Sequence, residues 1–110
     1  MDAEKLKTFY GKLIQNMDAE YEMADMFTYT KKELDKKILL GLADGTIQGK
    51  NAQEREAAGI KLYEEDFDVL ERIEREYEQA KHNRQVAEVE LKCLRDLIRL
   101  EELIVKESEV

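Results

Sequence analysis

The side chains of this sequence that could do chemistry are few, and their spacing does not assemble a reactive site. His82 is the single histidine, and Glu78 precedes it by four residues, so both lie on one helical face where they could share a metal ion. Metal sites in helical bundles need several glutamates and a Glu-x-x-His spacing, which this stretch lacks. Ser108 and Cys93 are the only serine and cysteine, and neither has a histidine near enough for nucleophilic catalysis. We therefore expect no enzyme, no metal and no cofactor, with His82 exposed to solvent.

One glycine-rich segment is the best candidate for ligand binding. Between Gly45 and Asn51 the backbone amides precede a predicted helix, and a lysine is available to pair with an anion. Gly49, Lys50 and Asn51 would hold that anion, which could belong to a nucleotide. The segment lacks the Gly-Lys-Ser/Thr ending of a phosphate-binding P-loop. The other interpretation is a capped turn that binds nothing.

The elements that would position these residues are helices. From Leu6 to Ile38 the apolar residues follow a four-three repeat, which predicts one helix over residues 3–42. Only Glu20 and Lys31 interrupt the repeat. Its apolar members are Leu6, Tyr10, Leu13, Met17, Ala24, Phe27, Leu34 and Ile38. Such a repeat packs one stripe of the helix against another element.

A turn over residues 43–51 separates this helix from a second one. Three closely spaced glycines supply the backbone freedom that a helix C-terminus and a turn require. Asn51 is a good N-cap, and Glu54 follows three residues later, which together form a capping box. Because no proline occurs anywhere, we predict a single helix over residues 52–106. A polar segment over residues 81–85 divides its apolar stripe, so a kink or a second turn is the alternative.

Folding the chain back at the turn gives an all-α, coiled-coil-like antiparallel hairpin, which we expect to form a single domain over residues 1–110. Residues whose numbers add up to about 96 would then face each other across the two antiparallel helices. The lysines of the first helix lie beside an acidic cluster of the second, which favours this pairing, although each exposed ion pair contributes under about 1 kcal/mol. The lysines are Lys31, Lys32, Lys36 and Lys37, and the acidic residues are Glu64, Glu65, Asp66 and Asp68.

The C-terminal part of the second helix has no partner in this hairpin. The first helix runs out near Leu6, opposite about residue 90, and the densest apolar stretch follows that point. An exposed apolar patch of this size is typical of a protein interface. We therefore expect a dimer or higher homo-oligomer, in a parallel or an antiparallel arrangement. The predicted oligomer interface consists of Leu91, Leu94, Leu97, Ile98, Leu100, Leu103 and Ile104.

The net charge of −8 is carried mostly by the second half of the chain. Residues 51–110 contain ten basic and seventeen acidic residues, whereas residues 1–50 contain eight basic and nine acidic ones. Such a surface repels the phosphates of nucleic acids and anionic membranes and attracts a basic protein surface. Two tyrosines that lie off the apolar stripe add a second contact face. The predicted partner-binding residues are Glu64, Glu65, Asp66 and Asp68, together with Tyr21 and Tyr29.

The cysteine content and the hydropathy pattern predict a cytoplasmic protein. Cys93 is the only cysteine, which excludes an internal disulfide bond. The stretch from Met1 to Lys5 lacks the basic-then-apolar order of a signal peptide. No apolar run approaches the roughly 20 residues that a membrane-spanning helix requires. We therefore expect neither export nor a membrane segment.

Two segments of the second half carry a resemblance to a known group of proteins. The first runs from Ile47 to Ala57 and has Gly-Lys-Asn followed by an arginine four residues after the asparagine, and the second runs from Leu94 to Glu101. Together they resemble small uncharacterised helical proteins encoded by phages and prophages of Gram-positive bacteria. The resemblance implies a phage accessory role in the host cytoplasm, where a small acidic protein binds and blocks a host protein, including components of defence systems. It transfers no catalytic residue.

These observations support three hypotheses about function. The leading one is a non-enzymatic protein-binding module of phage type, which occludes a host protein that has a basic surface. The second is a structural coiled-coil subunit whose only activity is self-association. The third is an oligomeric sponge that captures a nucleotide signal, with the glycine-rich turn as its binding site. The partner's identity is left open by all three.

Overall fold

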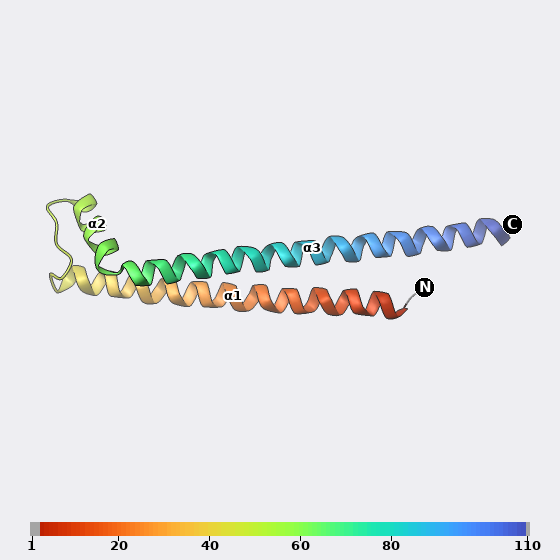
Figure 1. Cartoon of the computed structure of the whole chain (residues 1–110), viewed down its shortest axis with the longest axis horizontal. Coiled ribbons are helices and arrows are strands. Elements are labelled where there is room, and N and C mark those ends of the chain that lie inside the picture. The colour runs from red at the N-terminus through yellow and green to blue at the C-terminus, as the bar shows by residue number, and fades with distance from the viewer. Residues whose placement is uncertain (1–2, 110) are drawn as a thin grey trace. The chain divides into compact units, whose positions relative to one another are not determined.

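The computed structural model describes residues 3–109, and within that range the chain is all-α, as predicted. Helix α1 spans Ala3–Ala43, α2 spans Ala52–Leu62 and α3 spans Glu64–Glu109. Figure 1 shows the short α2 beside the end of α1 and the start of α3. The first helix therefore ends within one residue of its predicted end. No strand occurs among the residues that the structure describes.

The prediction of a single helix over residues 52–106 is wrong, because the chain breaks between α2 and α3 at Tyr63. This residue leaves the helical conformation, with φ −110° and ψ 34°, and its backbone amide still donates to the Gly59 carbonyl. Its phenol hydroxyl donates to the Lys37 carbonyl of α1 over 3.2 Å. The sequence also reverses charge here: Lys61 lies in the last turn of α2, and three acidic residues begin α3. The positive charge favours the C-terminus of α2 and the negative charges favour the N-terminus of α3, so the helix can break here without a glycine or a proline.

The polar segment over residues 81–85 causes no break. Helix α3 passes through it without interruption. The alternative of a second turn at this point is therefore wrong.

The chain divides into two compact units. The first, which we call the terminal unit, consists of α1 up to Tyr21 and α3 from Glu78 onward. The second, the turn unit, runs from Glu22 to Tyr77 and contains the end of α1, all of α2 and the start of α3. In each unit a segment of α1 packs against an antiparallel segment of α3.

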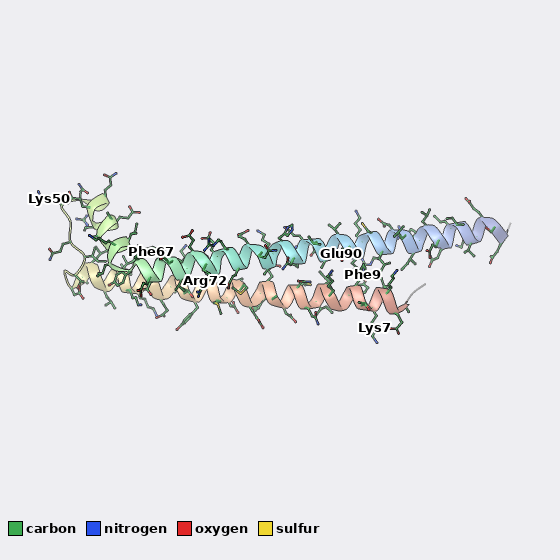
Figure 2. The ribbon with its side chains drawn as sticks, in the orientation of Figure 1. Lys7, Phe9, Lys50, Phe67, Arg72 and Glu90 are labelled. Carbon is green, nitrogen blue, oxygen red and sulfur yellow. The ribbon has the colours of Figure 1, made fainter. Side chains whose placement is uncertain are left out.

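The core of the terminal unit lies along one stripe of α3. Its buried residues are Ala80, Ala87, Leu91 and Leu94. The small alanine side chains allow the two helix backbones to approach each other. On α1, Figure 2 shows Phe9 directed towards α3 and Lys7 directed away from it.

The register of this packing differs from the predicted one by about one heptad. Lys12 faces Glu90 and Glu20 faces Arg84, so facing residue numbers add up to 102 and 104 rather than to about 96. The difference arises because α2 and its flanking turns occupy residues that a simple hairpin would have given to the second helix. Leu91 and Leu94 are consequently only 4% and 6% exposed, and the prediction that they lack a partner within the chain is wrong.

In the terminal unit, the inward stripe of α1 also differs from the predicted one at two positions. Leu6, Leu13 and Glu20 face inward or lie at the edge of the interface, as the four-three repeat predicts. Between them the half-buried positions are 9 and 16 rather than 10 and 17, so Tyr10 and Met17 lie on the exposed side. Asn16 is a polar residue at an inward position, which the apolar pattern could not indicate.

The turn unit has a separate core. Leu34, Ile47 and Ile73 are buried there, and the rings of Phe27 and Tyr77 stack with their centroids 6.3 Å apart. Ile47 folds back from the turn onto Gly41, where an added Cβ would lie 2.8 Å from the Ile47 Cδ1 atom. Glycine at position 41 therefore permits the turn to close against α1.

Candidate protein-interaction surfaces

The most specific polar contact in the terminal unit joins Glu20 and Arg84. The guanidinium donates two hydrogen bonds to the carboxylate, from Nε to Oε2 over 2.7 Å and from one Nη to Oε1 over 3.2 Å. The two side chains are only 20% and 22% exposed. The hydrogen bonds from Arg84 lower the pKa of Glu20, and those to Glu20 raise the pKa of Arg84. Both residues occupy inward positions of the helix pair, so their role is to hold the register and not to bind a ligand.

A strip of four residues on the outer side of α3 is not covered by α1. We call it the α3 outer strip: Cys93, Leu97, Leu100 and Ile104, all of them exposed. Leu97, Leu100 and Ile104 are each more than half exposed. Cys93 and Leu97 directly precede Leu94 and Ile98, which face α1. Because successive residues of a helix are rotated by about 100°, Cys93 and Leu97 point away from α1.

The end of α3 also continues past the start of α1. Figure 1 shows the C-terminal turns of α3 extending beyond the N-terminal end of α1. Val105 would face inward but is 56% exposed, because no part of α1 lies opposite it. The predicted oligomer interface therefore separates into buried core residues, Leu91 and Leu94, and residues that are at least partly accessible, which are Leu97, Ile98, Leu100, Leu103 and Ile104.

A second strip lies on α1 in the same unit. We call it the α1 outer strip: Tyr10, Ile14, Met17 and Tyr21. Each of these residues directly follows an inward-facing position of α1. Tyr10 is partly covered by Arg95, whose guanidinium carbon lies 5.0 Å from the ring centroid. Ile14, Met17 and Tyr21 are 56%, 50% and 71% exposed.

The predicted acidic contact residues all lie in the first turns of α3, in the turn unit. Asp66 is partly engaged within the chain, because its carboxylate accepts hydrogen bonds from the Lys37 ammonium over 3.2 and 3.3 Å. This is one of the lysine–acid pairs expected from the hairpin. Glu64, Glu65 and Asp68 are exposed, and Glu64 and Glu65 lie in the first turn of α3, where negative charge is stabilising. Their placement thus has a structural reason that is independent of any partner.

The turn unit also contains an apolar hollow of about 380 Å³. It is lined by Ile38, Leu42, Ala52, Arg55, Glu56, Gly59, Ile60 and Phe67. Its walls come from the end of α1, from α2 and from the start of α3. Tyr29, also in this unit, is 67% exposed on α1.

The glycine-rich turn is closed by its own side chains. Asn51 caps α2 by accepting a hydrogen bond from the Glu54 amide over 2.9 Å, as the capping box predicts. Glu54 returns this by accepting from the Lys50 amide over 2.7 Å. The Glu54 carboxylate is thus already hydrogen-bonded to the backbone amide that an anion would need, and its negative charge would repel an anion. Gly49 is tightly packed, since an added Cβ would lie 2.7 Å from the Arg55 backbone nitrogen.

Metal clusters and membrane-spanning helices are both absent from the described part of the chain. Across residues 3–109, no three histidine, cysteine, aspartate or glutamate side chains come together to form a metal-binding cluster. Every helix in that range is too short or too polar to span a bilayer. His82 is exposed on α3, and Cys93 is a free cysteine.

Several of these surfaces were not predicted. The pairing of Glu20 with Arg84 could not be predicted, because in the sequence each charged residue only interrupts an apolar stripe. Met17 was assigned to the apolar stripe, and Ile14 was given no role. Met17 is exposed because position 16, and not 17, faces inward. A second four-three repeat beside the first was the signal that could have identified both outer strips.

Comparison with known protein families, characterised proteins and solved structures finds no match to this chain. Its function therefore has to be argued from the surfaces themselves.

Proposed function

We propose that this chain is a non-enzymatic protein-binding module that self-associates and blocks a host protein, as an accessory or inhibitor protein of phage type. The observation that supports this proposal is the pair of outer strips on the terminal unit. Large apolar side chains that are half exposed or more and follow one another at helical spacing are typical of interaction surfaces. The resemblance of the second half to phage-encoded helical proteins supports the choice of partner class.

The two strips lie on opposite sides of the helix pair. Tyr10 and Arg95 contact each other, and each comes directly after an inward-facing residue in the sequence. Positions that follow an inward-facing residue therefore lie on one side of the helix pair. Lys12 and Glu90 form an ion pair over 2.9 Å, and each comes directly before an inward-facing residue in the sequence. Positions that precede an inward-facing residue therefore lie on the other side of the helix pair. The α1 outer strip consists of following positions, and the α3 outer strip of preceding ones. One strip can therefore bind a partner while the other binds a second copy.

The α1 outer strip is the better surface for a partner protein. Methionine and tyrosine side chains adapt to different apolar surfaces, and tyrosine adds a hydrogen-bonding hydroxyl. Asp18 and Glu22 lie beside Met17 and Tyr21 on the exposed part of the helix. We expect a partner with an apolar ridge bordered by basic residues, whose binding weakens as salt screens the charges.

Affinity capture from a lysate of a Gram-positive bacterium tests this role. The bait is the full chain, compared with Met17→Glu on the strip and with Gln15→Glu, which adds the same charge at an exposed position off the strip. We expect one host protein to be retained by the native chain and by Gln15→Glu, to be lost with Met17→Glu, and to elute with added salt. Equal capture by all three baits, or capture that salt does not affect, would contradict the proposal.

A second candidate function is a structural subunit whose only partner is itself. The α3 outer strip favours it, because self-association through this surface would need no other partner. The two functions differ in one respect: the structural subunit captures no host protein even when both strips are intact.

A further inference from the structure

We infer that the α3 outer strip is covered by the same strip of a second copy, in antiparallel orientation, with Cys93 opposite Ile104 and Leu97 opposite Leu100. This inference deepens the self-association in the proposed function and rests on it. Neither the spacing of apolar residues nor their exposure distinguishes parallel from antiparallel pairing. The charged residues beside the strip do.

The strip has the repeat of a coiled-coil seam. Its members are separated by four, three and four residues, which is the spacing that keeps one face of a helix against a partner helix. The strip is self-complementary around a two-fold axis, because Cys93 and Ile104 meet each other at its ends and Leu97 and Leu100 meet each other at its centre. A contact of this kind is closed and gives a dimer.

Parallel pairing is opposed by charge. In a parallel coiled coil, the residue before one seam position lies near the residue that comes five places later on the partner. Asp96 would then lie near Glu101 of the second copy, and this repulsion would occur twice in the dimer. Both residues are exposed beside the strip, so no other part of the chain covers them.

Antiparallel pairing in the proposed register reverses this effect. Asp96 then lies beside Leu103 of the second copy, between Arg99 and Lys106 and away from Glu101. At each end of the seam Glu90 faces Glu107 of the second copy, and its charge is balanced by Lys12 of its own chain, whose Nζ lies 2.9 Å from the Glu90 carboxylate. A shift of about seven residues one way along the helix brings the two Asp96 carboxylates together. A shift of about four residues the other way places Cys93 opposite Ser108 and leaves fewer apolar contacts. The charges beside the strip therefore favour the antiparallel orientation, and the charges and apolar contacts together favour this register.

Disulfide formation reports the orientation directly, because Cys93 is the only cysteine in the chain. The experiment compares the native protein, Ile104→Cys, and Ile104→Cys combined with Cys93→Ser, after mild oxidation and at concentrations above about 0.1 mM, since so small an interface binds weakly. Ile104 is exposed, so all three proteins should fold, and circular dichroism checks this. Non-reducing electrophoresis and light scattering give the cross-link and the mass.

We expect a covalent dimer from Ile104→Cys and none from the other two proteins. Cross-linking of the native protein through Cys93, or of the double variant through position 104, would show parallel pairing and overturn the inference. A dimeric mass with no cross-link in any protein would overturn the register. A monomeric mass for the native protein would instead remove the self-association on which the inference rests.

Asp96→Lys provides a second readout of opposite sign for the two orientations. In the antiparallel dimer the new lysine meets Arg99 and Lys106, so self-association should weaken about tenfold or more. In a parallel dimer the same change would pair the lysine with Glu101 and strengthen association. Sedimentation equilibrium measures the change, and a tighter dimer would contradict the inference.

Discussion

Glu20 and Arg84 show how two charged residues can occupy the interior of a helix pair. Each would be costly alone, because a partly buried charge without a partner loses its hydration. Together they exchange two hydrogen bonds, one of them only 2.7 Å long, and the remaining guanidinium contact goes to Glu88 over 3.2 Å. A pair of this kind fixes register, because sliding either helix by a turn would separate it.

Replacing Glu20 tests that role. Glu20→Gln removes the charge opposite Arg84 and should lower Tm by roughly 5–10 °C near neutral pH. Thermal unfolding followed by circular dichroism measures the shift, and the double exchange Glu20→Arg with Arg84→Glu should recover part of it. Asp18→Asn, which removes an exposed carboxylate in the same helix, serves as the control and should change little.

The pH dependence provides a further check on the same pair. The pKa of Glu20 is lowered in the folded state by the hydrogen bonds from Arg84, so its contribution to stability is complete above the unfolded pKa. That contribution is lost as pH falls through the lowered pKa. The difference in Tm between the native chain and Glu20→Gln should therefore shrink as pH falls below the ordinary pKa of a glutamate and disappear once pH is below the lowered pKa of Glu20. A difference that persists in acid would show that the substitution at position 20 affects packing and not charge.

At the scale of elements, the long helices, the turn over residues 43–51 and the cap could be predicted, and the break between α2 and α3 could not. Repeats of three and four residues locate α1 and α3, and the Asn51 capping box locates the start of α2. These are local signals. The charge reversal around Tyr63 is also local, but the hydrogen bond that holds Tyr63 against α1 goes to the Lys37 carbonyl, 26 residues away in the sequence. No local pattern reports such a contact, and the register error follows from missing it.

Two glycines of α1 should respond to the same substitution with opposite signs. Gly41→Ala places a Cβ against the buried Ile47 side chain and should destabilise the fold by about 1–3 kcal/mol. At Gly11 an added Cβ would meet no atom within 4 Å, and Gly11→Ala should stabilise the helix by about 0.5–1 kcal/mol. Chemical denaturation of both variants measures these changes. Equal effects would show that the turn does not close against Gly41.

At the scale of the whole molecule, the candidate surfaces were only partly predictable. Apolar density towards the C-terminus indicated an interface, and Leu97, Leu100, Leu103 and Ile104 are accessible as expected. Leu91 and Leu94 could not be separated from them by composition, because their burial depends on where α1 ends relative to α3. The acidic residues at the start of α3 were assigned to a partner, although Asp66 pairs with Lys37 within the chain.

The corrected register also determines how self-association should be tested. Ending the chain at Glu90 would remove Leu91 and Leu94 from the core and would unfold the terminal unit for reasons unrelated to assembly. A substitution on the α3 outer strip avoids this, because Leu100 is exposed within the chain. Gln85→Glu adds the same charge at an exposed position of α3 that lies off the strip.

The most direct test is the solution mass of the full chain by light scattering over a range of concentrations, compared with Leu100→Glu and Gln85→Glu. We expect the native chain and Gln85→Glu to reach the mass of a dimer or larger assembly as concentration rises, and Leu100→Glu to remain a monomer. A native chain that stays monomeric throughout, or a Leu100→Glu variant that associates as the native chain does, would contradict self-association through the α3 outer strip.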